Sequence, residues 1–256
     1  MVRVTPPGGS QMVGIDWETA AIMVITLDRP ERRNAVDLPS LLALREALAE
    51  ATREERPARV VVLTGAPPAF CAGADLDGVE NTEFTATLLS VLKGFTELPV
   101  PVIAAIDGAA LGAGTQLASV CDLRVATSRS RFGIPAARLG IAVDQWTVSR
   151  VSQEFGAPIT RAMLLAAETY DGERLHQAGV VHRIGGFEEA MTWAKEIATL
   201  APLTIAGHKV ALERGTPVMV VDPAVEQARL AAWDSADAIE GKAAFMEKRP
   251  AQFTGR

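Results

Sequence analysis

Cysteine and histidine are scarce in this chain of 256 residues. The two cysteines, Cys71 and Cys121, lie in apolar surroundings rich in alanine and glycine. This context indicates buried free thiols in a reducing compartment rather than a disulfide framework. The three histidines, at positions 176, 182 and 208, lack the spacing of metal ligands, so we expect no metal site.

Basic residues are also fewer than acidic residues. The chain has 25 Lys and Arg against 31 Asp and Glu, a formal net charge of −6. This balance argues against a nucleic-acid-binding surface or a basic face for membranes. An anionic ligand would have to be held by a local cluster of basic side chains.

Long apolar runs are missing as well. Residues 1–13 contain no run long enough for a signal peptide, and the nearly uncharged stretch 98–120 is interrupted by Pro99, Pro101, Asp107 and several glycines. We therefore expect no transmembrane helix and a cytoplasmic protein.

The residues that are present suit a soluble α/β protein. Hydrophobic residues make up 48% and charged residues 22%, enough for one large domain or a core with a small appendage. β-Branched and apolar runs predict strands, the first of them in a hairpin with the preceding GIDWET, at 21–27, 59–63, 100–106, 122–127 and 180–184. Helices are predicted from Pro39 to about residue 51 and over 83–97, 114–120, 144–155, 158–167, 187–200, 203–214 and 223–239.

Two loops that follow predicted strands are built from small residues. They are AFCAGADL (69–76) and DGAALGAGTQLA (107–118). Small residues let a ligand approach the backbone, and two N–H groups from such loops can bind a carbonyl oxygen as it becomes an oxyanion. Either loop alone is more typical of an ordinary structural turn, since such turns commonly follow strands.

In this order and spacing the two loops resemble those of the crotonase family, also called the enoyl-CoA hydratase/isomerase family. The resemblance extends over TLDRPERRNAV (26–36), 61–76, 101–126, RFGIPAARLGI (131–141) and FMEKRPAQF (245–253). It implies an α/β fold in which ββα repeats form a spiral core (1–195), followed by a helical C-terminal trimerisation region (196–256). Assembly as a homotrimer or a dimer of trimers is expected.

The resemblance also implies a ligand, an acyl thioester of coenzyme A, and no permanently bound cofactor. The thioester oxygen should meet the N–H groups of Ala74 and Ala113. The implied CoA-binding residues are Ala72, Asp75 and Leu76 for the adenine, and Arg29, Arg32, Arg33, Lys248 and Arg249 for the phosphates. Each arginine is equally well interpreted as part of a solvated surface.

Both acids of the family's hydratases are missing. Gln116 and Ala136 stand where the resemblance predicts the two glutamates that activate water and deliver a proton. Glutamine can hold a water molecule but cannot take its proton at neutral pH, and alanine can do neither. Efficient hydration of an enoyl thioester is therefore not expected.

One carboxylate remains. Asp144 aligns with a position that some family members use for other chemistry, including dienoyl-CoA isomerases, although their partner glutamate corresponds to Ala136. Asp144 could instead cap the helix that follows it. Trp146 could line the acyl pocket or pack in the core.

Two functions remain open. The chain binds fatty acyl-CoA without efficient turnover and delivers it to another protein of lipid metabolism, or it is an enoyl- or dienoyl-CoA isomerase that uses Asp144 as its base.

Overall fold

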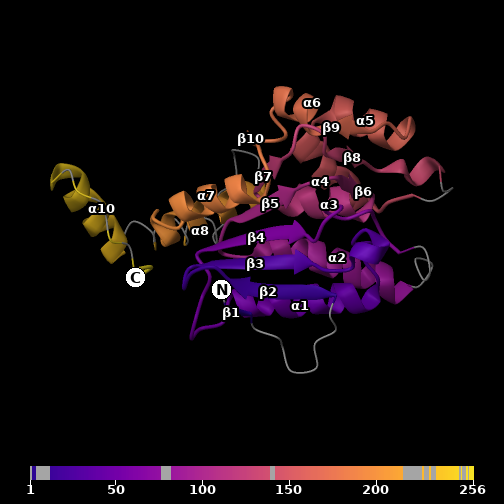
Figure 1. Cartoon of the computed structure of the whole chain (residues 1–256). Coiled ribbons are helices and arrows are strands. Elements are labelled where there is room, and N and C mark those ends of the chain that lie inside the picture. The colour runs from indigo at the N-terminus through magenta and orange to yellow at the C-terminus, as the bar shows by residue number, and fades with distance from the viewer. Residues whose placement is uncertain are drawn as a thin grey trace.

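Two β-sheets and the helices packed on them form the body of the protein (Figure 1). The computed structural model describes residues 2–3, 12–75, 82–138, 142–215, 227, 231, 235–247, 249, 252 and 254–256. The larger sheet has the order β1-β2-β3-β4-β5-β7-β10 and the smaller one β6-β8-β9. The strands are β1 (Val2–Arg3), β2 (Val13–Trp17), β3 (Ile22–Leu27), β4 (Val60–Gly65), β5 (Val102–Ile106), β6 (Ala109–Leu111), β7 (Leu123–Ala126), β8 (Arg131–Gly133), β9 (Tyr170–Asp171) and β10 (Arg183–Ile184).

The helices alternate with strands in the first part of the chain, and helices predominate towards its C-terminus. They are η1 (Pro30–Arg32), α1 (Leu38–Ala51), α2 (Thr82–Glu97), α3 (Ala113–Val120), η2 (Pro135–Arg138), α4 (Gln145–Phe155), α5 (Ala157–Leu165), α6 (Gly172–Gln177), α7 (Phe187–Ile197), α8 (Pro202–Arg214) and α10 (Ala236–Glu247). No helix in these parts of the chain is long and apolar enough to cross a membrane.

The expected spiral of ββα repeats is confirmed. The units β2-β3-α1, β5-β6-α3 and β7-β8-α4 each run through two strands into a helix, and β4 reaches α2 by way of a single bridge between Cys71 and Ala110. β3, β4, β5 and β7 pair in parallel in the larger sheet, while β6 and β8 pair in parallel in the smaller one. The loops that end these strands are thereby stacked along one side of the molecule.

Both faces of the larger sheet are buried at its central strands β3, β4 and β5, which explains their continuous apolar runs. Because successive side chains point to opposite faces, Met23, Ile25 and Leu27 pack in the main core with α1 and α2. Ile22 and Val24 pack on the other face, in a smaller core with α7. Strand boundaries at the central strands agree with the sequence prediction within two residues.

The predicted strand 180–184 is wrong in its first residues. The N–H groups of Val180 and Val181 donate to the carbonyl of Leu175 and close a turn after α6, so β10 starts only at Arg183. α6 and the short strands β6, β8 and β9 were not predicted. The predicted helix 223–239 lies mostly outside the described residues, and α10 continues past its expected end to Glu247.

A buried lysine fastens α8 to the core. The ammonium group of Lys209 donates to the carbonyl oxygens of Phe95 (3.1 Å) and Val100 (3.0 Å) and pairs with Asp122 Oδ2 at 2.7 Å. Only 5% of the Lys209 side chain is exposed. α10, in contrast, extends away from the two sheets (Figure 1).

We predict that Lys209→Met lowers the free energy of unfolding by about 3 kcal/mol, because it removes the donor of two carbonyl groups and the cation beside the partly buried Asp122 carboxylate, which keeps the Val102 N–H as a donor. Urea denaturation measures the change. Lys195→Met is the matched control, since the Lys195 side chain is 57% exposed and its ion pair with Glu18 is long, at 3.8 Å. Equal stability of the two variants would contradict this role of Lys209.

Candidate functional site

The two small-residue loops meet through their glycines. Gly114, in the first turn of α3, lies so close to the other loop that a Cβ atom would stand 2.2 Å from the carbonyl oxygen of Cys71. Gly73 (φ 128°) and Gly112 (φ 53°) adopt backbone conformations that side chains rarely allow, and a Cβ on Gly112 would lie 3.6 Å from the Cα of Gly73. The N–H of Leu111 donates to the same Cys71 carbonyl at 2.9 Å. The loops are therefore held in direct contact.

This contact leaves two N–H groups available. Ala113 is the first residue of α3, so its N–H has no acceptor within the helix. Ala74 is bridged to Val36 through its neighbours, because Val36 donates to Gly73 and Asp75 donates to Val36. Within the described residues neither the Ala74 N–H nor the Ala113 N–H has an acceptor. Both can donate to a ligand oxygen, aided at Ala113 by the helix dipole.

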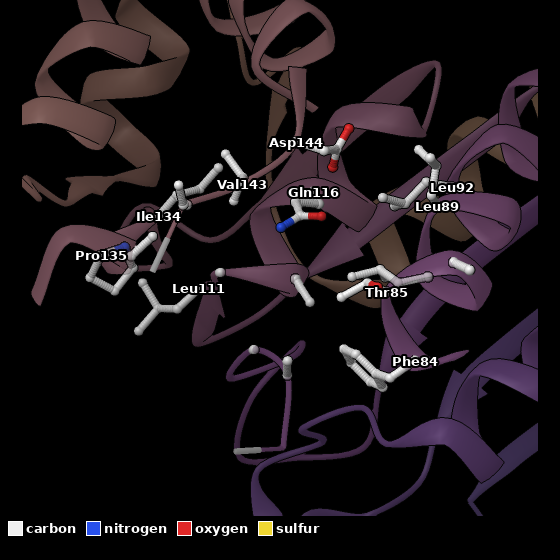
Figure 2. Close-up of a pocket in the computed structure, with 18 of the residues that line it drawn as sticks. Phe84, Thr85, Leu89, Leu92, Leu111, Gln116, Ile134, Pro135, Val143 and Asp144 are labelled. Atoms are coloured by element: carbon white, nitrogen blue, oxygen red, sulfur yellow. The ribbon is translucent and has the colours of Figure 1, made fainter. Parts of the chain in front are cut away.

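A cavity of about 640 Å³ opens at these two residues. Its walls are mainly apolar: residues of α2 form one side, and residues of η2 and the segment before α4 form the other (Figure 2). The lining residues are Ala72, Gly73, Ala74, Thr82, Phe84, Thr85, Ala86, Leu88, Leu89, Leu92, Leu111, Gly112, Ala113, Gln116, Ile134, Pro135, Ala136, Ala142, Val143 and Asp144. The volume and composition are typical of a site for a small organic ligand.

The three residues singled out for catalysis all line this cavity. Gln116 lies one turn after Ala113 on α3 and is 7% exposed, and Ala136 lies in η2 and is 9% exposed. In Figure 2 the Gln116 amide extends into the cavity between the α2 side chains and Ile134. The amide has no hydrogen-bond partner among the residues that the structure describes.

Asp144 is both exposed and engaged as a helix cap. Its Oδ1 accepts from the Thr147 N–H at 3.0 Å, and its Oδ2 accepts from the Thr147 hydroxyl at 2.7 Å. The carboxylate also borders the cavity (Figure 2). Each oxygen retains capacity for a second hydrogen bond, so capping and contact with a ligand are compatible.

The loop that carries Arg29, Arg32 and Arg33, called the basic loop below, lies beside the first of the two small-residue loops, but its arginines differ in their contacts. Arg29 forms ion pairs with Asp75 (3.1 Å) and Asp37 (3.2 Å), and its side chain is 13% exposed. These carboxylates compensate its charge, so Arg29 has a structural role here rather than a free guanidinium for phosphate. Arg32 and Arg33 are exposed, and neither has an ion pair within the described residues.

The other residues assigned to CoA are only partly described. Ala72 lines the cavity, and its N–H donates to the backbone carbonyl of Arg33 at 3.0 Å, which places the basic loop beside it. Arg249 forms ion pairs with Glu240 and Glu247. Leu76 and Lys248 lie outside the described residues.

Trp146 does not line this cavity. It borders a second cavity of about 380 Å³ between α2, α4 and α8, and Lys93 Nζ lies 6.0 Å from the centre of its ring. The ring also packs against the main core. A side chain two residues after Asp144 points to a different side of α4, which the sequence pattern alone did not reveal.

Both cysteines are free and buried, as expected. Burial raises the pKa of the Cys71 thiol to about 12, and likewise that of Cys121. Although Cys71 supports the contact between the loops, its thiol is protonated at neutral pH and is unsuited to act as a nucleophile.

Two features that shape the site, the hydrogen bonds of Asn34 and the cavity-facing side chains of α2, were not predicted from the sequence. Asn34 is buried, has a φ of 58°, and donates to the carbonyls of Ala66 (2.7 Å) and Ala69 (2.6 Å), which fixes the basic loop to the loop beside the cavity. The apolar side chains of α2 have the spacing of an ordinary core helix, and only the three-dimensional structure distinguishes cavity-lining positions such as Leu89 from core positions.

Comparisons with known proteins identify the family and the fold. A sequence model of the family described as enoyl-CoA hydratase/isomerase matches residues 18–256. A Mycobacterium tuberculosis protein named "Probable enoyl-CoA hydratase echA6" is 41% identical over 245 residues, 95% of this chain and 100% of that protein. The crystal structure of an enoyl-CoA hydratase/carnithine racemase from Magnetospirillum magneticum has a TM-score of 0.89 at 28% identity over 97% of both chains. That of an enoyl-CoA hydratase from Bacillus anthracis has a TM-score of 0.85 at 29% identity, over 96% of this chain and 100% of that one.

We predict that Gly114→Ala lowers the free energy of unfolding by about 2 kcal/mol, since the added methyl group must displace the Cys71 carbonyl or the start of α3. The shift in melting temperature measures this loss. Gly186→Ala is the control, because a Cβ there meets nothing within 4 Å. Similar melting temperatures for both variants would show that the loops tolerate separation.

Proposed function

The chain belongs to the enoyl-CoA hydratase/isomerase family, and from this membership we propose that it binds fatty acyl-CoA thioesters without efficient hydratase activity. The thioester oxygen accepts hydrogen bonds from the N–H groups of Ala74 and Ala113. The acyl chain occupies the apolar cavity next to them. The ligand is then handed to another protein of lipid metabolism.

The observation that carries this proposal is that two N–H groups without an acceptor among the described residues, those of Ala74 and Ala113, belong to the lining of a large apolar cavity. An apolar chain gains free energy by leaving water for such a cavity, at about 0.8 kcal/mol per buried methylene group. The two donors supply the few polar contacts that fix the orientation of a ligand. The described lining residues include no lysine or arginine, which favours an uncharged acyl chain over one that ends in a carboxylate.

The residues around the acyl group oppose hydration. A water molecule that attacks the third carbon must lose a proton, and the second carbon must gain one. Gln116 and Ala136 line the cavity where the family resemblance predicts the two glutamates, and neither can transfer a proton. Each positioned acid or base contributes roughly 10²–10⁴-fold in rate, so their loss removes a large part of the catalysis, and the two N–H donors alone supply only the remainder.

The remaining parts of the proposal concern the CoA moiety and assembly. Arg32 and Arg33 are exposed beside the cavity loop and are suited to bind phosphate groups, with Lys248 as a further candidate. Residues 196–256 form the oligomerisation region of a homotrimer or dimer of trimers, and residues 1–195 the core. Leu212 in α8 and Ile239 in α10, 80% and 73% exposed, support such an interface. A cytoplasmic location completes the proposal.

The alternative is an enoyl- or dienoyl-CoA isomerase. The position of Asp144 at the cavity favours it, because one carboxylate can take a proton from one carbon of an allylic system and return it to another. The relatives named as hydratases favour an enzymatic function, but they do not favour isomerisation in particular.

We predict that the native protein hydrates a 2-trans-enoyl-CoA at least about a hundredfold more slowly than an ordinary hydratase. A Gln116→Glu/Ala136→Glu variant should gain activity, since it restores two acids to a site that already holds the substrate. Absorbance of the enoyl thioester, followed at high protein concentration, measures both. Ordinary hydratase rates in the native protein would refute the proposal.

The Asp144→Asn variant distinguishes an acyl-CoA binder from an isomerase. Asparagine caps a helix as well as aspartate does, so the variant keeps the fold but loses the base. If the chain is a binder, acyl-CoA affinity is retained and no isomerase activity is found in either protein. Turnover of 3-enoyl- or dienoyl-CoA that falls by about 10²-fold or more in the variant would instead establish the isomerase.

A further inference from the structure

Gln116 is the most unusual polar group of the cavity. It is 93% buried, it lines the cavity, and its side-chain amide has no hydrogen-bond partner among the described residues. Its polar atoms are accessible from the cavity, since among the described side chains only Trp17 Nε1 is fully buried without a partner. An amide that a ligand covers without pairing it is costly. The amide is therefore available to a ligand.

The helix register determines which part of the ligand the amide meets. Ala113 and Gln116 are three residues apart on α3, so their side chains share one face of the helix, about 4.5 Å apart along its axis. A thioester whose oxygen lies at the Ala113 N–H thus extends its next carbons past the Gln116 amide. The second and third carbons of the acyl chain are within reach of this side chain.

Most of the described residues that line the cavity with the amide are apolar, and Thr82, Thr85 and Asp144 are the exceptions. Ala136, Ile134 and Leu89 line the same cavity and carry no polar side-chain atoms. A saturated acyl chain that covers Gln116 must displace water and leave the amide unpaired. A polar substituent on the third carbon would satisfy it.

Asp144 restricts which polar substituents on the third carbon fit the site. It is the one charged side chain among the described residues of the cavity, and as a carboxylate it only accepts hydrogen bonds. A hydroxyl group can donate to Asp144 and accept from the Gln116 amide. A ketone can only accept, and its oxygen would face that of the carboxylate.

We propose that the site selects 3-hydroxyacyl thioesters over saturated acyl thioesters of the same length, with Gln116 as the residue that determines this preference. The proposal rests on the acyl-CoA binding proposed above and narrows its ligand class. Because proton-transferring groups are missing at positions 116 and 136, the 3-hydroxyacyl group is retained rather than dehydrated.

The test is a set of calorimetric titrations of the native protein with decanoyl-CoA, (3S)- and (3R)-3-hydroxydecanoyl-CoA, and 3-oxodecanoyl-CoA. One 3-hydroxy isomer should bind about tenfold more tightly than decanoyl-CoA, the ratio expected for one satisfied buried amide. The 3-oxo compound should bind more weakly than that isomer. These comparisons need no variant.

Gln116→Met tests the assigned residue, since methionine has a similar length and no hydrogen-bonding amide. The preference for the 3-hydroxy compound should fall to about twofold or less, while decanoyl-CoA binds at least as tightly as before. Gln177→Met, an exposed glutamine of α6, is the control and should keep the tenfold ratio. Melting temperatures verify that each variant is folded.

The outcomes separate this inference from the function on which it rests. If decanoyl-CoA and both 3-hydroxy isomers bind equally, the selectivity is refuted but acyl-CoA binding stands. Tighter binding of the 3-oxo compound also overturns it. If no thioester binds, the proposed function fails and the inference with it.

Discussion

The contact between Gly114 and the carbonyl of Cys71 is the constraint on which the site depends. A Cβ atom at position 114 would stand 2.2 Å from that oxygen, so only glycine lets the first turn of α3 approach the other loop so closely. This approach brings the N–H groups of Ala74 and Ala113 to one cavity, although the residues come from different ββα units. Without it, each loop would be an ordinary turn after a strand.

The other end of α3 is fixed by charge. Arg124 donates to the carbonyl oxygens of Ala118 (3.2 Å) and Cys121 (2.8 Å), and Arg150 donates to that of Ser119 (2.8 Å). Two guanidinium groups at a helix C-terminus satisfy free carbonyls and oppose the negative end of the dipole. α3 is thus held by backbone contact at its N-terminus and by arginines at its C-terminus, which limits how far the Ala113 N–H can move.

The central strands could be predicted from the apolar runs of the sequence, because such runs are local signals. The spiral of ββα units and the meeting of the two loops were expected only from the family resemblance, since β6, β8 and β9 are too short to give a clear local signal. Whether Gln116 faces the cavity could not be predicted from the sequence, since it depends on the distance between α2 and α3. The ion pairs of Arg29 were missed because Asp75 is distant along the chain, although both lie in recognisable loops. The direction of Trp146 likewise depends on which side of α4 meets α2 and α8.

The central claim is that two backbone N–H groups polarise a thioester carbonyl. The most direct measurement is the infrared stretching frequency of a ¹³C-labelled thioester carbonyl in decanoyl-CoA, free and bound to the native protein. Hydrogen bonds from Ala74 and Ala113 weaken the carbonyl double bond, so a lower frequency is expected in the complex. An unchanged frequency in a fully bound sample would mean that the carbonyl lies elsewhere, and would refute this binding mode.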